Sequence, residues 1–212
     1  MKKNNLIIIS LFLLMSNFVF TNLYSKISNI IVVKVGGSLI TSLDVKNEIL
    51  TNLVINKQEI TQENINNNKN FAIKNLINKS IKMNEINRFE IKDYNSADLK
   101  NYLENISKNL NTNSGGLRKI FEQNEINYEI FVGHYKTELL WNTLIFELYK
   151  NSTNINIIEV DTEVEKIKGN KSEEELKKIR EKISNIKREE KLNLFSRSHF
   201  SNLENTVTVN FQ

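Results

Sequence analysis

The sequence contains no cysteine and no proline, and only 6 of its 212 residues are glycine and 2 are histidine. Without cysteine there is no disulfide, no cysteine nucleophile and no thiolate ligand for a metal ion. Two histidines are too few for a metal site built from several histidine ligands. Six glycines are too few for a dinucleotide-binding enzyme with several glycine-rich turns. The absence of proline and the scarcity of glycine favour long helices.

Asparagine, isoleucine and lysine are abundant, with 35, 28 and 24 residues respectively. This usage is typical of AT-rich coding sequences, so a single asparagine or lysine carries little chemical information. The formal net charge is +4, and it would fall to +2 without Lys2 and Lys3. A nearly balanced charge argues against a nucleic-acid partner. The apolar fraction of 40% is enough to form a core, so a wholly disordered chain is excluded.

The first 25 residues have the pattern of a secretory signal peptide. Lys2 and Lys3 form a basic start, an apolar run follows from residue 6 to residue 20, and Ser25 is a small residue after it. The run is shorter than the roughly 20 apolar residues of a membrane-spanning helix. We therefore expect export with cleavage near Ser25. An N-terminal anchor that stays uncleaved is the alternative.

Apolar residues predict strands at both ends of the remaining chain. Residues 31–35 are β-branched and precede Gly36-Gly37, and residues 38–40 can return as a second strand, which is the pattern of a tight hairpin. Residues 206–211 alternate between polar and apolar side chains, as a half-buried strand does. Because unpaired strands leave open backbone edges, we predict that the segment at 31–35 pairs with the segment at 206–211 in one small sheet.

Between these strands the apolar residues have helical spacing. Capping-box patterns begin at Thr41 and Ser172, and each predicts the start of a helix. Ser96 is expected to cap a further helix, and Asn127 a long one that ends near Tyr149. We expect the helix after Ser172 to be a bent helix of about thirty residues.

Several short stretches then follow one another in a recognisable order. They are Ile40-Thr41-Ser42-Leu43-Asp44-Val45, Ser96-Ala97-Asp98-Leu99, Asn127-Tyr128-Glu129-Ile130-Phe131, Lys136-Thr137-Glu138-Leu139, Lys182–Arg188 and Leu192–Phe195. This order resembles the N-terminal domain and the C-terminal helix and strand of the SurA family of periplasmic chaperones. The resemblance implies a signal peptide at 1–25, a helical domain at 26–168, and a long helix and strand at 169–212 that pack back on that domain. The implied fold is mainly α, with a small β-sheet that pairs the N- and C-terminal strands.

The same resemblance implies an ATP-independent chaperone in the periplasm of a Gram-negative bacterium. Its partners would be unfolded outer-membrane proteins or other extended apolar peptides. Full-length relatives carry one or two parvulin prolyl isomerase domains between the two matching parts, whereas only residues 164–171 separate them here. We therefore expect no catalytic residue, no isomerase activity, no cofactor, no metal ion, and no nucleotide or nucleic-acid partner. A protein that retains isomerase activity and a structural adaptor with one folded partner are the alternatives, and the oligomeric state stays open.

The aromatic residues of the predicted helix from 128 to 149 give the candidate binding site. At 100° per residue, Tyr135 and Trp141 lie about 240° apart, so one flat contact does not cover both. We predict an apolar cleft for extended peptide, lined by Phe131, Tyr135 and Trp141, with Leu192 and Phe195 of the last helix as its other wall. The alternative is that all of these side chains belong to the core.

Three weaker patterns receive structural interpretations. The Gly-Gly-Ser of residues 36–38 after a strand resembles the phosphate-binding strand of amino-acid kinases. A kinase needs further glycine-rich turns, so a plain hairpin is expected. His134 and His199 are expected as partly buried helix residues. The acidic stretch at 161–165 is expected to be a solvated helix face rather than a cation site, because it lacks the central glycine of a calcium loop.

Overall fold

The computed structural model describes residues 29–212, and the predicted signal peptide at 1–25 lies outside this range. Of the described residues 73% are helical, in seven helices accompanied by a small three-stranded antiparallel sheet, which confirms the expected mainly α fold. The helices are α2 (Ser42–Ile55), α3 (Gln62–Arg88), α4 (Ser96–Asn109), α5 (Ser114–Gln123), α6 (Tyr128–Tyr149), α7 (Ile157–Ile167) and α8 (Glu173–Thr206), and the short 3-10 helix η2 (Lys150–Ser152) follows α6. None of the described helices combines the length and apolar character that a membrane crossing would require.

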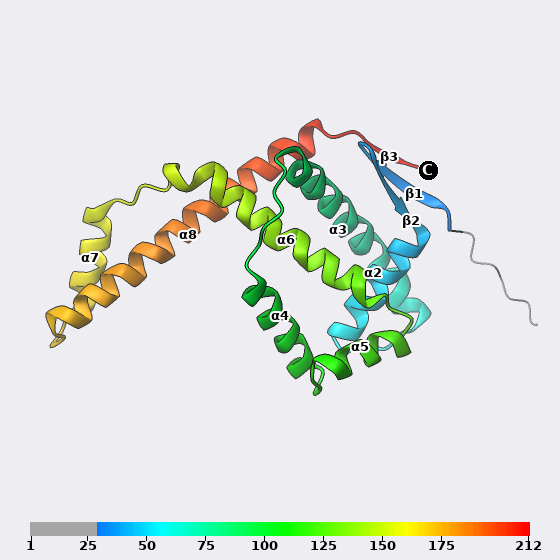
Figure 1. Ribbon diagram of the computed structural model, residues 1–212, viewed down its shortest axis with the longest axis horizontal. Coiled ribbons are helices and arrows are strands. Elements are labelled where there is room, and N and C mark those ends of the chain that lie inside the picture. The colour runs from blue at the N-terminus through cyan, green and yellow to red at the C-terminus, as the bar shows by residue number, and fades with distance from the viewer. Residues whose placement is uncertain (1–28) are drawn as a thin grey trace, which may run out of the picture.

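The sheet joins the two ends of the described chain. Its strands are β1 (Ile31–Val35), β2 (Ser38–Thr41) and β3 (Val209–Phe211), in the order β2-β1-β3. Both pairings are antiparallel, and Val33 of β1 lies opposite Phe211 of β3. Gly36 provides the turn between β1 and β2 with a φ of 55°, a conformation that favours glycine. The predicted pairing of the two ends is confirmed, and Figure 1 shows β1 and β3 side by side.

Three of the seven described helices begin at the side-chain caps that the sequence predicts. The capping boxes that start at Thr41 and Ser172 are both complete, and the Asn127 side chain accepts hydrogen bonds from the first turn of α6. One cap differs from the prediction. Asn95, not Ser96, caps α4, because its side-chain oxygen accepts the hydrogen bond of the second helical residue. Ser96 is therefore the first residue inside the helix.

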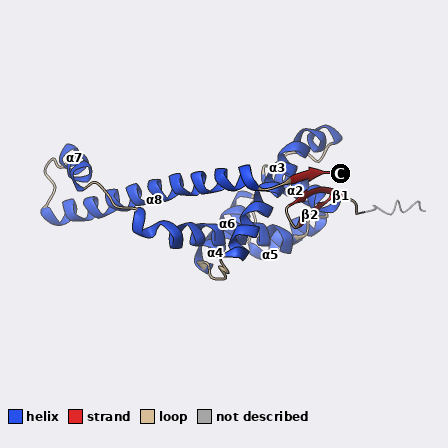
Figure 2. Cartoon of the chain, turned by 90° about the horizontal axis from the view of Figure 1, so that it is seen from above, coloured by secondary structure: helices blue, strands red, loops and turns tan. Residues whose placement is uncertain are grey.

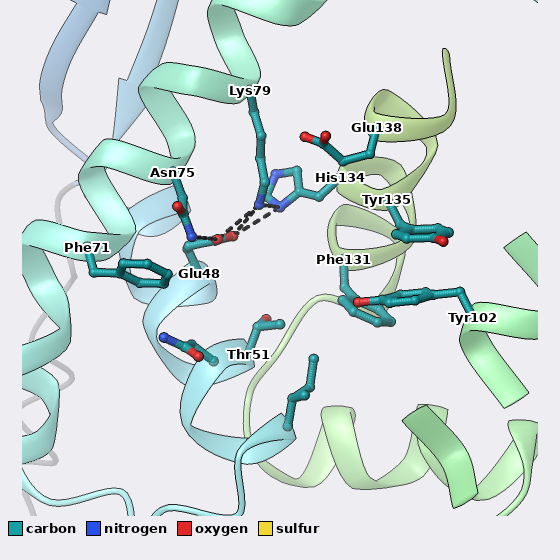
Figure 3. Close-up of a pocket in the computed structure, with 12 residues that line it drawn as sticks. Glu48, Thr51, Phe71, Asn75, Lys79, Tyr102, Phe131, His134, Tyr135 and Glu138 are labelled. Atoms are coloured by element: carbon teal, nitrogen blue, oxygen red, sulfur yellow. Dashed lines mark hydrogen bonds and ion pairs between the residues drawn. The ribbon is translucent and has the colours of Figure 1, made fainter. Parts of the chain in front are cut away.

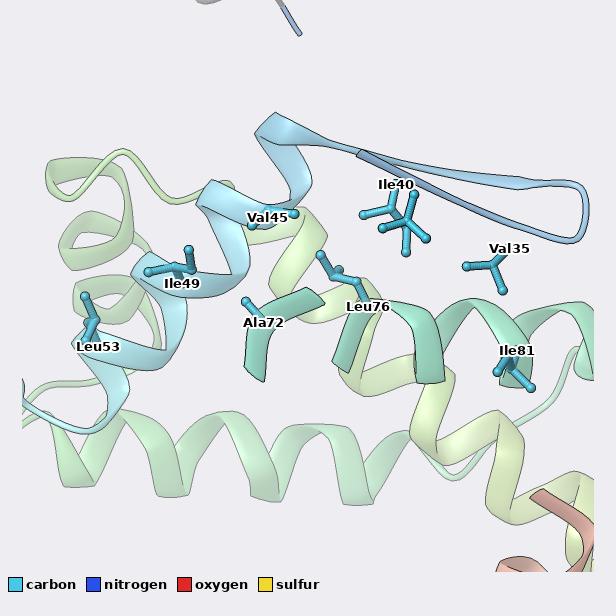
Figure 4. Packing of buried hydrophobic residues seen from close by; sticks show 9 residues of the cluster. Val35, Ile40, Val45, Ile49, Leu53, Ala72, Leu76 and Ile81 are labelled. Carbon is cyan, nitrogen blue, oxygen red and sulfur yellow. The ribbon is translucent and has the colours of Figure 1, made fainter. Parts of the chain in front are cut away.

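The main core lies beneath the sheet. Apolar side chains from β1, β2, α2 and α3 meet there, and the C-terminal end of α8 closes it with Phe200 and Leu203. Figure 4 shows how the side chains of α2 and α3 face each other and the sheet. The buried members are Val33, Val35, Ile40, Val45, Ile49, Leu53, Ala72, Leu76 and Ile81. This core fixes α2 against α3, and the site described below uses the same two helices.

Helix α7 and the N-terminal half of α8, which we call the arm, project from the body of the molecule (Figures 1 and 2). A separate cluster of Val160, Val164 and Leu176 holds α7 against α8. Lys187 bridges carboxylates of α7, which makes the acidic stretch an ion-paired helix surface. The predicted domain boundary after residue 168 falls between these two packed helices. The C-terminal half of α8 returns to the body, where it packs on α6 and α3.

Candidate functional site

A cavity of about 270 Å³ lies between α2, α3, α4 and α6. Aromatic side chains from three helices form its walls: Phe71 from α3, Tyr102 from α4, and Phe131 and Tyr135 from α6 (Figure 3). We call it the Glu48 cavity, after the buried carboxylate on its α2 side. The other lining residues are Thr51, Asn52, Ile55, Asn75, Lys79, His134 and Glu138.

Glu48 is only 7% exposed, and it accepts hydrogen bonds from side chains of a neighbouring helix. Lys79 Nζ lies 2.9 Å from Oε1 and 2.8 Å from Oε2, and Asn75 donates its side-chain N–H to Oε1 at 3.3 Å. On the α6 side, His134 Nδ1 is 3.1 Å from Glu48 Oε2 and 3.0 Å from Lys79 Nζ. The three side chains of Glu48, Lys79 and His134 therefore tie α2, α3 and α6 together at one edge of the cavity (Figure 3).

The pKa of Glu48 reflects this environment. Burial by itself would raise the pKa, because a charged carboxylate loses its hydration. The hydrogen bond with His134, together with the charge and the hydrogen bond of Lys79, outweighs burial and lowers the pKa from 4.5 to about 2. Glu48 therefore stays ionised, and its charge is compensated within the network rather than by solvent.

The opposite wall is a stack of two tyrosines. The rings of Tyr102 and Tyr135 are 3.5 Å apart between centroids and only 5° from parallel. Burial, followed by electrostatic interactions with Tyr135 and with the carboxylate of Glu48, raises the pKa of Tyr102 to about 12. Burial also raises the pKa of Tyr135, and the carboxylates of Asp98 and Glu138 add to this. Both tyrosines are therefore neutral phenols at physiological pH, available as apolar surface with a polar edge.

Thr51 lies within the cavity lining with its hydroxyl unsatisfied. The residue is 9% exposed, and Oγ1 has no hydrogen-bond partner among the described residues. A buried hydroxyl without a partner costs about 1–3 kcal/mol of stability. The oxygen has almost no accessible surface, so the unpaired hydroxyl is a local cost to stability and not an open contact for a ligand in the cavity.

The five residues predicted to line one cleft lie in two separate places. Phe131 and Tyr135 line the Glu48 cavity. Trp141, Leu192 and Phe195 lie where α6 and α8 pack together. The single cleft expected between α6 and the C-terminal helix is therefore absent from the part of the chain that the structure describes, because α8 packs directly on that face of α6.

Trp141 in particular belongs to the core. It is 2% exposed, and its Nε1 donates a hydrogen bond to Ser196 Oγ of α8 at 2.8 Å. Phe200 contacts its ring edge-on, with a centroid distance of 6.1 Å. Phe195 stacks on Tyr149 at 4.7 Å in the same interface. These contacts use the aromatic surface for packing, so Trp141 is not open to a ligand.

The same interface contains a second histidine–glutamate pair. His199 of α8 has its Nε2 2.9 Å from Glu85 Oε1 of α3 and its Nδ1 2.8 Å from the Tyr149 hydroxyl of α6. Glu85 is 4% exposed. These contacts hold α8 to both α3 and α6. His134 and His199 are thus partly buried helix residues, as predicted, and each is bonded to a buried carboxylate.

Sequence reasoning did not single out Glu48, Thr51, Lys79 or Tyr102. One signal was present for Glu48, because it lies on the same helical face as Val45 and between two buried stripe positions. A carboxylate on an apolar face is buried only when it is paired. The position of its partners on α3 and α6 depends on the fold and has no local signature.

No family model and no curated protein matches the chain. Within residues 29–212 no group of three or more histidine or carboxylate side chains is arranged to hold a metal ion. The function is therefore inferred from the geometry of the Glu48 cavity.

Proposed function

We propose that the protein is an ATP-independent periplasmic chaperone that holds unfolded outer-membrane proteins, or other extended apolar peptides, by binding alone. The observation that supports this best is the Glu48 cavity, whose walls are formed by aromatic side chains from three helices. Aromatic walls receive apolar side chains of many shapes.

The size and position of the cavity fit this use. A volume of about 270 Å³ is enough for part of a side chain and its backbone rather than for a folded partner. Phe71 stands at the rim with 53% of its surface exposed, so apolar surface continues outward from the cavity. Unfolded barrel strands carry alternating apolar side chains and unpaired backbone groups. Such a chain can place one side chain in the cavity while its neighbours stay in solvent.

The buried ion network holds the walls of the cavity in place before a client binds. Glu48, Lys79 and His134 connect three helices that form the walls. A preformed site loses less conformational freedom on binding, which favours affinity. Holding an unfolded chain this way lowers its free concentration by mass action and needs no chemical step.

Light scattering by an unfolded outer-membrane barrel, diluted from denaturant into buffer with or without the protein, tests the proposal. We expect the protein to suppress scattering, and Tyr135→Ala and Phe71→Ala to weaken that protection severalfold without a large change in melting temperature. Phe146→Ala is the matched control, because Phe146 is 48% exposed on α6 and does not line the cavity. Equal protection by all three variants would exclude the cavity as the client site. No protection by the unmodified protein would reject the chaperone function itself.

A second measurement separates a chaperone from an adaptor with one folded partner. Size-exclusion chromatography with several unrelated unfolded clients should give complexes with each of them. A single stoichiometric complex with one folded protein, and none with unfolded clients, would favour the adaptor.

We place the protein in the periplasm as part of this proposal because residues 1–25 have the sequence pattern of a secretory signal peptide. A fusion of the full chain to alkaline phosphatase, which is active only after export, tests it. An inactive fusion would contradict export.

A further inference from the structure

Strand β3 has a backbone edge that no further strand covers within residues 29–212, because the order β2-β1-β3 ends there (Figure 1). The carbonyl of Thr208 and the N–H of Gln212 bond to the β1 side, at 2.9 Å and 3.0 Å. Residues that bond to a given neighbour alternate along an antiparallel strand. The N–H and C=O groups of Val209 and Phe211 therefore point away from β1, where the backbone of another extended chain can bond to them.

The opposite edge of the sheet, along β2, offers fewer free groups. Leu39 points its backbone groups outward, because Lys34 opposite it lies in register with β3 and bonds in that direction. The next outward group is the N–H of Thr41, which already donates to the carboxylate of Asp44 at 2.8 Å in the capping box of α2. A register shift also interrupts the pairing of β1 with β2 near this point. Such irregularities protect a sheet edge from further pairing, so β3 is the more open edge.

The side chains at this edge suit apolar neighbours. Val209 and Phe211 are two residues apart and therefore lie on the same face of β3. Val209 packs against the main core, whereas Phe211 is 67% exposed. An added strand would place a side chain directly beside each of them. A strand with apolar residues at alternate positions would therefore cover Phe211 while its polar residues face solvent.

An apolar groove adjoins the end of β3. It has a volume of about 520 Å³ and shares no residue with the Glu48 cavity. Gln212, the residue after β3, lines it together with Val32 of β1, Ile49 of α2 and Ile65 of α3. We call it the β3-end groove. Sites that bind a peptide by strand addition combine main-chain hydrogen bonds with pockets for alternate side chains, and β3 with this groove has both features.

We propose that β3 binds an extended segment of an unfolded chain as a fourth strand, with apolar side chains beside Phe211 and in the β3-end groove. A row of free N–H and C=O groups is matched by the backbone of another extended chain. Pairing with the β3 of a second copy would join only three residues on each side, whereas an unfolded chain is long enough to pair and also to fill the groove. The site does not depend on the proposed chaperone function, because its groove and the Glu48 cavity have separate linings.

Fluorescence anisotropy of a short labelled peptide, titrated with the purified protein, tests the proposal. In this peptide threonine alternates with valine, and a lysine at each end keeps it soluble. The control is the same peptide with methylated backbone nitrogens, which keeps the side chains but cannot donate backbone hydrogen bonds. We expect saturable binding of the first peptide and binding of the second weaker by more than tenfold, since each lost hydrogen bond weakens binding about fivefold. Absence of saturable binding, or equal affinity of the two peptides, would overturn the proposal.

Two proline variants distinguish the edges of the sheet. Val209→Pro removes an N–H that points away from β1 and leaves the hydrogen bonds between β1 and β3 in place, a position where edge strands tolerate proline. We expect it to weaken peptide binding about fivefold, the effect of one hydrogen bond. Leu39→Pro is the matched control, because it removes an outward N–H from β2, and it should leave the affinity unchanged. Full affinity in Val209→Pro, or an equal loss in Leu39→Pro, would overturn the assignment to β3.

A second pair of variants tests the groove. Asn66 and Asn67 are both exposed neighbours on α3, but only Asn66 lines the β3-end groove. Asn66→Trp should obstruct the groove and weaken peptide binding severalfold, while Asn67→Trp should bind the peptide as the unmodified protein does. Equal affinities of these two variants would show that the peptide does not enter the groove and would overturn that part of the proposal.

Amide hydrogen exchange of the unmodified protein, followed by NMR, locates the peptide without any substitution. Saturation with the peptide should slow exchange of the N–H groups of Val209 and Phe211 and leave that of Leu39 unchanged. Unchanged exchange at Val209 and Phe211 would overturn the proposal, as would a dimer in sedimentation that Val209→Pro dissociates, since a second copy would then occupy the edge. Tyr135→Ala should bind the peptide normally, so failure of this proposal is distinguishable from failure of the chaperone proposal.

Discussion

The two histidines of the chain are each bonded to a buried glutamate, but the two pairs lie in different surroundings. Glu48 and His134 stand at the edge of a cavity and share a lysine. Glu85 and His199 lie in the interface of α8 with α3 and α6, where the Tyr149 hydroxyl contacts the second histidine nitrogen. A glutamate–histidine pair therefore borders a cavity in one region, and in the other it holds α8 against α3 and α6. The role of each pair therefore depends on its third partner, Lys79 or Tyr149, and on whether α8 covers it, rather than on the pair itself.

The largest expected effect tests whether the region under α8 is closed core. We expect Trp141→Ala to lower the free energy of unfolding by about 3–5 kcal/mol, because a buried aromatic side chain leaves a cavity when it is truncated. Urea denaturation followed by far-UV circular dichroism measures this, since Trp141 is the single tryptophan.

Phe146→Ala on the same helix is the control, and it should cost less than about 1 kcal/mol because Phe146 is 48% exposed. A loss for Trp141→Ala as small as that for Phe146→Ala would mean that the contact between α6 and α8 contributes little to stability.

The sequence predicted features that satisfy backbone hydrogen bonds better than it predicted side-chain contacts between helices, and these two regions show why. The capping boxes at Thr41 and Ser172 and the pairing of the end strands follow from backbone hydrogen bonds that the chain has to satisfy. Trp141 was assigned to a cleft because helical spacing shows which side chains share a face, but not which face another helix covers. Glu48 was missed because its partners lie 31 residues away on α3 and still further on α6.

The second prediction concerns the stability of the protein in acid and the ionised Glu48 beside the cavity. The pKa of Glu48 is lowered from 4.5 to about 2 in the folded state, so its stabilising contribution is complete above the ordinary pKa and is lost as the pH falls from about 5 to about 2. Across this window the unmodified protein should lose about 3 kcal/mol more than Glu48→Gln does. Urea unfolding of both proteins at a series of pH values measures the difference. Parallel pH profiles would contradict the ionised network.

A double-mutant cycle on each pair compares their strengths directly. We expect a coupling free energy of about 1–2 kcal/mol between Glu85 and His199, and below about 1 kcal/mol between Glu48 and His134. The reason is that Lys79 contacts both oxygens of Glu48 and continues to compensate its charge when His134 is replaced. Arg88, the charged neighbour of Glu85, is 64% exposed and substitutes less well for His199. Equal coupling free energies would show that Lys79 does not make the Glu48–His134 pair weaker than the Glu85–His199 pair.

For the last prediction, on prolyl isomerase activity, we expect no effect. If both histidines serve the fold, the protein should not accelerate prolyl isomerisation of a test peptide, and His134→Ala and His199→Ala should leave the background rate unchanged. A protease-coupled isomerisation assay measures this. Acceleration that either substitution abolishes would show that one of the pairs has a catalytic role.

The pairing of β1 with β3 has a consequence for the order of folding. The hairpin of β1 and β2 is local and can form early, whereas β3 joins it only after the chain has closed a loop that includes every described helix. Until then one edge of β1 stays open and can accept any other extended strand. Completion of the sheet is therefore a late event, and during biosynthesis it has to wait until residues 209–211 have been made.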